Sequence, residues 1–215
     1  MKIRKKLPKP LEAVFGFIEL LFATLLAVSL VFTYLLRIVE VSGDSMSATL
    51  ETGDKVIMTA FCNNPKQGDI VVFYASDAVT LDENGRLVFS AGIRQNLMKR
   101  VIAAEGQTVD FDFSAGKVFV DGKELNESYI SGLTHSDQGA FTGKYPVTVP
   151  EGYVFVMGDN RRASIDSRAK ELGFVSEDDI IGKVITKSAE IDKVNITDII
   201  TLNAIKPICT VKKAF

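Results

Sequence analysis

An uninterrupted apolar run dominates the hydrophobic pattern at the start of the chain. No charged residue lies between Leu20 and Leu36, and extending the run back to Ala13 adds only Glu19. About 22 helical residues at 1.5 Å each cover about 33 Å, which matches the ~30 Å hydrocarbon core of a bilayer. The pattern therefore predicts a transmembrane helix over residues 13–37.

Two other interpretations of this apolar run fit it less well. A cleaved signal peptide has an apolar stretch of roughly 7–15 residues followed by a small-x-small exit, and no such exit follows Leu36. A helix buried in a soluble core would carry a polar stripe, whereas the charge-free run offers only Thr24, Ser29 and Thr33. We therefore interpret the run as a retained membrane anchor.

Positive charges gather on one side of the anchor. The residues that precede Glu12 include Lys2, Arg4, Lys5, Lys6 and Lys9. Because basic flanks remain in the cytoplasm, we expect residues 1–12 to be cytoplasmic and residues 38–192 to form an extracytoplasmic β domain. Residues 193–215 form a C-terminal tail to which the pattern assigns no element.

Beyond the anchor, short runs rich in Val, Ile and Phe alternate with turn signals, which is typical of β-strands. The sequence predicts strands over Lys55–Phe61, Asp69–Tyr74, Arg86–Ser90, Leu97–Ala104, Thr108–Phe113, Lys117–Val120, Tyr153–Met157 and Ile180–Ile185. Asn84-Gly85 and Asp121-Gly122 are hairpin signals, and the polar segment Ser131–Lys144 is typical of a surface loop. The predicted fold class is mainly β, with packed or closed antiparallel sheets after one N-terminal transmembrane helix.

Composition narrows the classes of function. The 215 residues suit one soluble domain plus a membrane segment, and a net charge of −2 provides no basic field for nucleic acid. Cys62 and Cys209 fit no metal-ligand spacing, and a disulfide and two unpaired thiols are equally compatible with their positions. The single histidine, His135, lies in a polar loop, so no metal site or other cofactor is expected.

A serine and a lysine are the candidate catalytic groups. Ser45 lies in the turn-like segment Ser42–Leu50, and Lys99 lies in an apolar predicted strand between Leu97 and Val101. A serine needs a base to become a nucleophile, and a lysine can serve once burial lowers its pKa from about 10.4 toward the working pH. Taken alone, Ser45 also fits an ordinary turn residue and Lys99 an edge-strand lysine.

A third segment gives these two residues a joint context. Gly158–Arg168 follows an apolar strand and contains Asp166 and Arg168, which are able to pair and brace a loop. Ser164 offers a hydroxyl that is able to orient a lysine amine. The alternative interpretation of this segment is a surface turn of mixed charge.

Together the three segments resemble the motifs of the type I signal peptidases, the bacterial leader peptidases. Ser42–Leu50 matches their nucleophile motif, Ser-Gly-x-Ser-Met-x-Pro-Thr-Leu, except that Ala48 replaces the proline. Lys99–Ile102 matches their Lys-Arg-Val-Ile motif, and Gly158–Arg168 matches Gly-Asp-Asn-Arg-x-x-Ser-x-Asp-Ser-Arg throughout. Gly68–Phe73 resembles the remaining core strand, and all the motifs occur in the family's order with the anchor first.

The resemblance implies a role for each matching residue. Ser45 would be the nucleophile, Lys99 the general base, and Ser164 would position the lysine amine. The other supporting residues would be Gly158, Asp159, Asn160, Asp166 and Arg168. The candidate substrate-binding residues that flank the dyad in sequence are Val39, Val41, Met46, Leu50 and Met98. The oxyanion would be held at Ser45, through its backbone N–H, beside Gly43, which stands where some members have a serine donor.

The implied enzyme is a serine endopeptidase anchored in the cell membrane. It would remove N-terminal signal peptides from exported preproteins, cutting after small residues at −1 and −3 of an extended substrate strand. Its implied partners are these preproteins, the lipid bilayer and the protein export machinery, without nucleic acid.

Three rival interpretations predict different observations. A self-cleaving repressor also uses a Ser–Lys dyad, but it should carry a DNA-binding domain in place of an anchor. A degenerate peptidase paralogue that acts as a chaperone or assembly factor should have lost the nucleophile or the base. An anchored β domain that only binds peptides predicts no hydrolysis.

Overall fold

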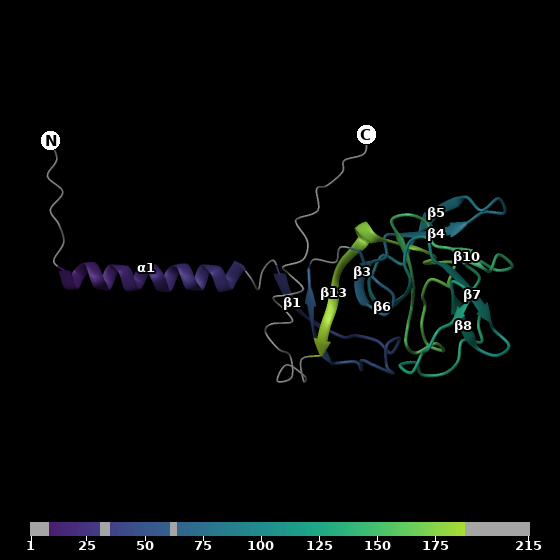
Figure 1. The fold of residues 1–215 in the computed structure, drawn as a ribbon, viewed down its shortest axis with the longest axis horizontal. Coiled ribbons are helices and arrows are strands. Elements are labelled where there is room, and N and C mark those ends of the chain that lie inside the picture. The colour runs from purple at the N-terminus through teal and green to yellow at the C-terminus, as the bar shows by residue number, and fades with distance from the viewer. Residues whose placement is uncertain (1–8, 31–34, 61–63, 188–215) are drawn as a thin grey trace. The chain divides into compact units, whose positions relative to one another are not determined.

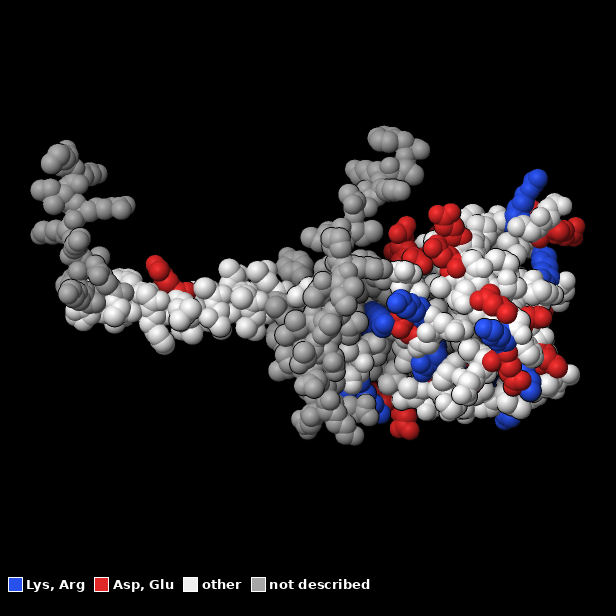
Figure 2. Space-filling model, viewed as in Figure 1, with Lys and Arg blue, Asp and Glu red and all other residues white. Residues whose placement is uncertain are grey.

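In a computed structural model, residues 9–30, 35–60 and 64–187 are described, and the chain divides into two compact units, residues 1–37 and 38–215. The first unit contains helix α1 (Lys9–Leu30), shown as the purple coil in Figure 1. Its segment Ala13–Leu30 has a mean hydropathy of 2.2 and is not buried against protein. Figure 2 shows the helix almost free of charged side chains. By length and composition α1 is able to cross a membrane.

The ends of this helix differ from the predicted anchor. α1 begins at Lys9 rather than Ala13, because Pro10 lies in the first turn, where the missing N–H of proline costs nothing. At the other end, Leu36 and Arg37 were predicted to belong to the anchor and instead lie in strand β1 (Leu36–Glu40). Several predictions fall outside the described residues, namely those for Lys2, Arg4, Lys5, Lys6, Phe61, Cys62, Cys209 and the tail 193–215.

In the rest of the described structure, strands arranged in sheets are joined by turns and loops (Figure 1). The seven-stranded sheet has the spatial order β1, β2 (Lys55–Thr59), β13 (Ile180–Lys187), β3 (Ile70–Tyr74), β6 (Asn96–Ala103), β11 (Tyr153–Met157) and β12 (Val175–Ser176). The four-stranded sheet has the order β10 (Val147–Thr148), β7 (Thr108–Asp112), β8 (Lys117–Val120) and β9 (Lys123–Glu124). A hairpin joins β4 (Asp77–Leu81) to β5 (Leu87–Ala91), and a short 3₁₀ helix, Glu177–Asp179, precedes β13.

The antiparallel, mainly β fold confirms the predicted class. The Asp121-Gly122 signal gives the expected two-residue hairpin, because both residues have positive φ, 52° and 73°, as a type I′ turn requires. The short return strand expected after this turn is β9, whereas the pattern missed β1, β4 and the two-residue strands β10 and β12. A two-residue strand carries no hydrophobic period, and tertiary pairing alone defines it.

Three hydrophobic clusters hold the sheets together. The largest packs the β6–β11 region against the four-stranded sheet and includes Ile102, Val118 and Phe155. A second cluster contains residues of β3, β6 and β11. The third, beside β2, contains Val41, Met46, Leu50 and Val56 together with the partly buried Val39, Ile70, Met98 and Val184. This third cluster matters for function because it contains the segment that surrounds Ser45.

Ser131–Lys144 is not the simple surface loop that its polarity predicted. Thr134, Ala140 and Phe141 are buried. The Gln138 side chain donates a hydrogen bond to the Ser164 carbonyl at 2.7 Å, and the Ala140 amide donates to the Arg168 carbonyl at 2.8 Å. The segment therefore packs against the 158–168 region, which a count of polar residues does not reveal.

Candidate active site

Ser45 lies in a series of turns that its apolar neighbours anchor. Met46 and Leu50 are buried in the third cluster, and the Leu50 amide donates a hydrogen bond to the Met46 carbonyl at 2.8 Å. Ser47, between them, and Ser45 itself are partly exposed. Burial of two apolar side chains four residues apart thus holds a reachable hydroxyl at the domain surface.

Lys99 comes from β6 and meets this hydroxyl. Its Nζ lies 2.6 Å from Ser45 Oγ, although 54 residues separate the two in sequence. The lysine is only 3% exposed. Burial lowers the pKa of Lys99 from 10.5 to about 8, because desolvation outweighs the nearby carboxylate of Asp166. A buried amine that loses its proton near pH 8, in contact with a serine hydroxyl, has the properties of a general base.

The 158–168 segment fixes the turn around Ser45. The Asn160 backbone N–H donates to the Ser45 carbonyl at 2.9 Å. The Asn160 side-chain amide donates to the Asp44 carbonyl at 3.1 Å and to the Ser47 hydroxyl at 3.0 Å. One asparagine thus binds three residues of the turn, Asp44, Ser45 and Ser47.

Asp166 and Arg168 form a fully buried ion pair beneath the site. Two parallel hydrogen bonds of 2.8 Å join the guanidinium to the carboxylate. Asp166 also accepts a hydrogen bond from the Gly158 backbone N–H at 3.1 Å. Burial opposes ionisation of Asp166, but the hydrogen bonds and charge of Arg168 outweigh it, so the pKa of Asp166 lies below its ordinary value. The pair is therefore charged and braces the loop.

Gly158 lies where no side chain fits. A Cβ added at this position would lie 2.3 Å from Ser164 Oγ and 2.5 Å from the Ser45 carbonyl oxygen. The Ser164 hydroxyl is buried, and it helps to lower the pKa of Asp166. The glycine thus allows Ser164 and the Ser45 segment to approach each other closely.

Five residues that the sequence analysis did not assign also hold this region. They are Thr49, Arg100, Glu127, Arg161 and Ser167. Arg100 forms two hydrogen bonds with the buried carboxylate of Asp159, which also accepts one from the Thr49 hydroxyl at 2.5 Å. The sequence could have identified Arg100, because it follows Lys99 directly and a buried carboxylate such as that of Asp159 requires a positively charged partner. Glu127 had no such signal, since it lies far from every motif.

The structure places the remaining predicted residues as follows. In the described part of the chain the Ser45 backbone N–H donates no hydrogen bond, which leaves it available to an oxyanion. Gly43 has a φ of 93° and offers no side-chain donor. His135 is exposed, and its ring lies 3.0 Å from the Phe113 carbonyl oxygen.

The five candidate substrate-binding residues lie in one place. Val39, Val41, Met46, Leu50 and Met98 all belong to the third cluster. Val41, Met46 and Leu50 are buried, whereas Val39 and Met98 keep part of their surface exposed. Val39 and Met98 are therefore the members that a bound peptide is able to touch, and the other three support them.

Comparison with known proteins shows which protein family the chain resembles. The family described as signal peptidase, peptidase S26, matches residues 14–188. A probable signal peptidase I-1 of Synechocystis is 37% identical over 166 residues, which cover 74% of this chain and 76% of the relative. Signal peptidase I P of Bacillus subtilis subsp. natto is 31% identical over 176 residues, which cover 79% of this chain and 85% of the relative.

A solved structure of a signal peptidase I from Enterococcus faecalis is also similar, with 28% identity and a TM-score of 0.41, and covers 59% of this chain and 100% of that one. The family match spans most of the described residues, including all three motif segments. The chain therefore belongs to the signal peptidase family, peptidase S26, and is a serine endopeptidase of that family.

Proposed function

We propose that this peptidase removes signal peptides from exported preproteins with Ser45 as nucleophile and Lys99 as general base. The observation that carries the proposal is the 2.6 Å contact between a partly exposed hydroxyl and a buried amine whose pKa is lowered to about 8. We also propose that Ser164, whose buried hydroxyl lies at the Gly158 contact, orients the lysine amine.

In the proposed mechanism, neutral Lys99 accepts the proton of Ser45 while Oγ attacks the scissile carbonyl carbon. The Ser45 backbone N–H stabilises the negative oxygen of the tetrahedral intermediate. The Lys99 ammonium then gives its proton to the leaving amine, which departs as the new N-terminus of the mature protein. Lys99 next takes a proton from water, the resulting hydroxide attacks the acyl-enzyme ester, and Ser45 recovers its proton as the signal peptide leaves.

An unpaired strand segment beside Lys99 supports binding of an extended substrate. β3 pairs with β6 along Asn96–Arg100, whereas β11 pairs with β6 only along Arg100–Ala103. Among the described residues, 96–99 therefore have no strand partner on the β11 side. A preprotein segment is able to add there as a strand through main-chain hydrogen bonds.

The same arrangement supports a proposed preference for small residues at −1 and −3. Side chains two apart on a strand point to the same face. Val39 and Met98 lie over the buried part of the third cluster, so the space they leave is shallow. We therefore propose that these residues admit small side chains at both positions and exclude large ones.

The anchor places this chemistry at the membrane. The 15 residues from Leu30 to Ser45 reach at most ~50 Å when fully extended, which sets an upper bound on the distance between the nucleophile and the end of α1. A preprotein held in the bilayer by its own apolar segment is confined to the same plane, which raises its effective concentration. We propose that the β domain is extracytoplasmic, that the N-terminus is cytoplasmic, and that the export machinery delivers the substrate.

The test is cleavage of a preprotein by the detergent-solubilised full chain, followed by sequencing of the new N-terminus. We expect one cut, after a small-x-small sequence, that Ser45→Ala and Lys99→Ala each reduce by at least about 10³-fold. Lys99→Arg serves as the matched control, because an arginine keeps the positive charge but does not lose its proton and so is unable to act as the base. Unchanged cleavage by Lys99→Ala would reject the lysine as base, and unchanged cleavage by Ser45→Ala would reject the dyad altogether.

A further inference from the structure

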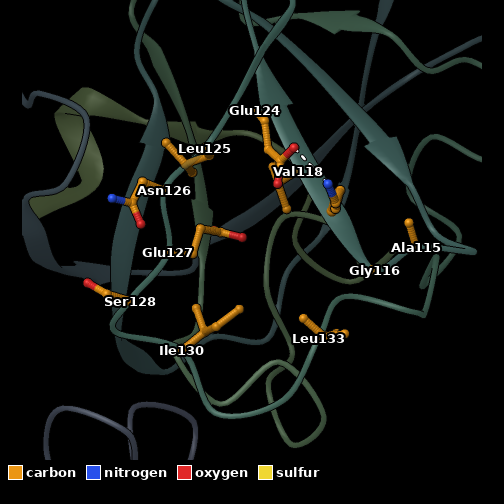
Figure 3. Close-up of a pocket in the computed structure, with 11 residues that line it drawn as sticks. Ala115, Gly116, Val118, Glu124, Leu125, Asn126, Glu127, Ser128, Ile130 and Leu133 are labelled. Atoms are coloured by element: carbon orange, nitrogen blue, oxygen red, sulfur yellow. Dashed lines mark hydrogen bonds and ion pairs between the residues drawn. The ribbon is translucent and has the colours of Figure 1, made fainter.

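A short segment that follows β9 contacts the loop Gly158–Arg168, which we call the motif loop, although the segment belongs to none of the sequence motifs. We call Glu127–Ser131 the strap. Figure 3 shows Glu127, Ser128 and Ile130 along the wall of a cavity of about 600 Å³. Because this wall faces open space, packing on that side does not hold the strap, and its position depends on its contacts with the active-site loops.

Glu127 and Ser131 attach the two ends of the strap to the motif loop. The Glu127 carboxylate pairs with the buried guanidinium of Arg161, which also donates to the Gly158 carbonyl at 3.1 Å. The Ser131 amide donates to the Asp159 carbonyl at 2.8 Å. The strap is thus fastened to the backbone of the residues that hold the Ser45 turn.

Tyr129 lies between these attachments and covers Arg100. The Arg100 guanidinium carbon is 4.1 Å from the centroid of the Tyr129 ring. On its edge the same guanidinium binds Asp159 through Nε at 2.8 Å and Nη2 at 2.6 Å. An aromatic face against a guanidinium is attractive and keeps water from the ion pair. The tyrosine hydroxyl adds only a 3.4 Å contact with Glu127.

We propose that Tyr129 is a positioning residue of the peptidase, whose ring clamps Arg100 against Asp159 and thereby holds the Ser45 turn against Lys99. The connection runs from Asp159 to the Thr49 hydroxyl, and through the adjacent Asn160 to the Ser45 carbonyl. Tyr129 touches neither Ser45 nor Lys99, so it acts through Arg100. This inference rests on the proposed Ser45–Lys99 mechanism.

The charged groups around Lys99 predict how loss of the Tyr129–Arg100 contact changes the pH dependence of activity. The charged groups that act on Lys99 are Asp166, Arg168 and Asp159. Without the Tyr129 ring, Arg100 is held less firmly and neutralises the charge of Asp159 less. Water also reaches the Arg100–Asp159 ion pair. Both changes stabilise the ammonium form of Lys99, so the protonated base persists to higher pH.

The experiment compares full-length variants in detergent across pH 6–10 with one preprotein substrate. We expect Tyr129→Leu to lower kcat about tenfold with little change in KM, and to move the acid limb of the kcat/KM profile to higher pH. Tyr129→Phe keeps the ring and should stay within about twofold of the parent. Leu133→Ala alters the wall of the same cavity without touching Arg100 and should leave the profile unchanged.

Three outcomes would overturn the proposal: a parental profile in Tyr129→Leu, equal losses in Tyr129→Phe and Tyr129→Leu, or a shift in Leu133→Ala. Should Tyr129→Leu fail to fold, Arg100→Lys provides a second route, because it keeps the charge and loses the planar stacking and the paired hydrogen bonds. We then expect the same shift, and its absence counts against the clamp. Failure of the proposed function is distinguishable, since it appears as residual cleavage in Ser45→Ala whatever Tyr129 does.

Discussion

Ser45 and Lys99 touch, yet they occupy very different environments. The serine is partly exposed, which the proposed attack on a peptide requires, while the lysine is almost fully buried, which the proposed role as a base requires. The Asp166 carboxylate acts in the opposite direction and favours the charged lysine. Desolvation is the larger effect, and it sets the properties of the proposed base.

The first prediction concerns activity against pH. Lys99 is protonated below its pKa of about 8 and neutral above it. Because only the neutral amine accepts the Ser45 proton, kcat/KM should rise about tenfold per pH unit below 8 and level off above it. Initial rates on a preprotein from pH 6 to pH 10 provide the measurement. A flat profile over this interval would be inconsistent with a lysine base.

The second prediction concerns stability against pH. Lys99 has a pKa of about 8 when folded and 10.5 when exposed. At 1.36 kcal/mol per pKa unit, this difference lowers the free energy of unfolding by roughly 3 kcal/mol while Lys99 is protonated. We call this loss the penalty for burying the ammonium group. Below pH 8 both states are protonated and the folded state bears the full penalty. Between pH 8 and 10.5 the folded state releases its proton first, so the penalty shrinks, and above 10.5 it is gone.

Lys99→Met removes this penalty while filling a similar volume. We expect its free energy of unfolding to exceed the parental value by up to about 3 kcal/mol at pH 7, with the gain disappearing above pH 10.5. Denaturant unfolding at pH 7 and pH 10.5 measures the two differences. Lys187→Met, which removes a partly exposed lysine that pairs with Asp54, is the control and should give no such gain. A gain that does not change with pH would show that Lys99 titrates as an ordinary lysine.

At the scale of elements, the 158–168 segment brings an unusual number of polar groups into the interior. Asp159, Arg161, Ser164, Asp166, Ser167 and Arg168 are all buried. Each charge has a partner, and the Ser167 hydroxyl accepts a hydrogen bond from the Val156 amide at 2.9 Å. Loss of any one member of such a network leaves another polar group buried without its partner, which makes the segment sensitive to small substitutions.

Gly158→Ala tests this sensitivity. The new methyl group would overlap Ser164 Oγ and the Ser45 carbonyl, so either the loop or the Ser45 turn has to move. A displacement of about 1 Å at the reacting atoms costs on the order of 10²-fold in rate, and we expect at least that loss in kcat. Circular dichroism should show that the variant keeps its sheets. Parental activity in a folded Gly158→Ala protein would show that this close contact is unimportant.

At the scale of the whole molecule, a β domain follows a helix that is able to span a bilayer. The basic N-terminus predicts the orientation, because cationic flanks remain in the cytoplasm. In spheroplasts, added protease should remove a tag placed at the C-terminus and spare one placed at the N-terminus. Lysis in detergent, which should expose both tags, is the control. Loss of the N-terminal tag from intact spheroplasts would contradict the orientation.

Local patterns identified much of this protein without coordinates. The apolar run, the Asp121-Gly122 hairpin and most of the longer strands are short-range properties, because hydrophobic period and turn chemistry depend on neighbouring residues. The segments that contain Ser45, Lys99 and Asp166 were found because a resemblance connected them. Strands β1 and β4 were missed, since Leu36–Glu40 continues the apolar anchor and Asp77–Leu81 lacks a clear alternation.

By itself, then, the sequence determined the anchor, the β class and the residues proposed for the chemistry. Only the tertiary structure decided that Lys99 is buried against Ser45, that Arg100 and Asp159 pair beside them, and that Tyr129 covers that pair. The reason is that these contacts join residues dozens of positions apart. Sheet pairing and burial, rather than local chemistry, set the distance between Nζ and Oγ and the pKa that accompanies it.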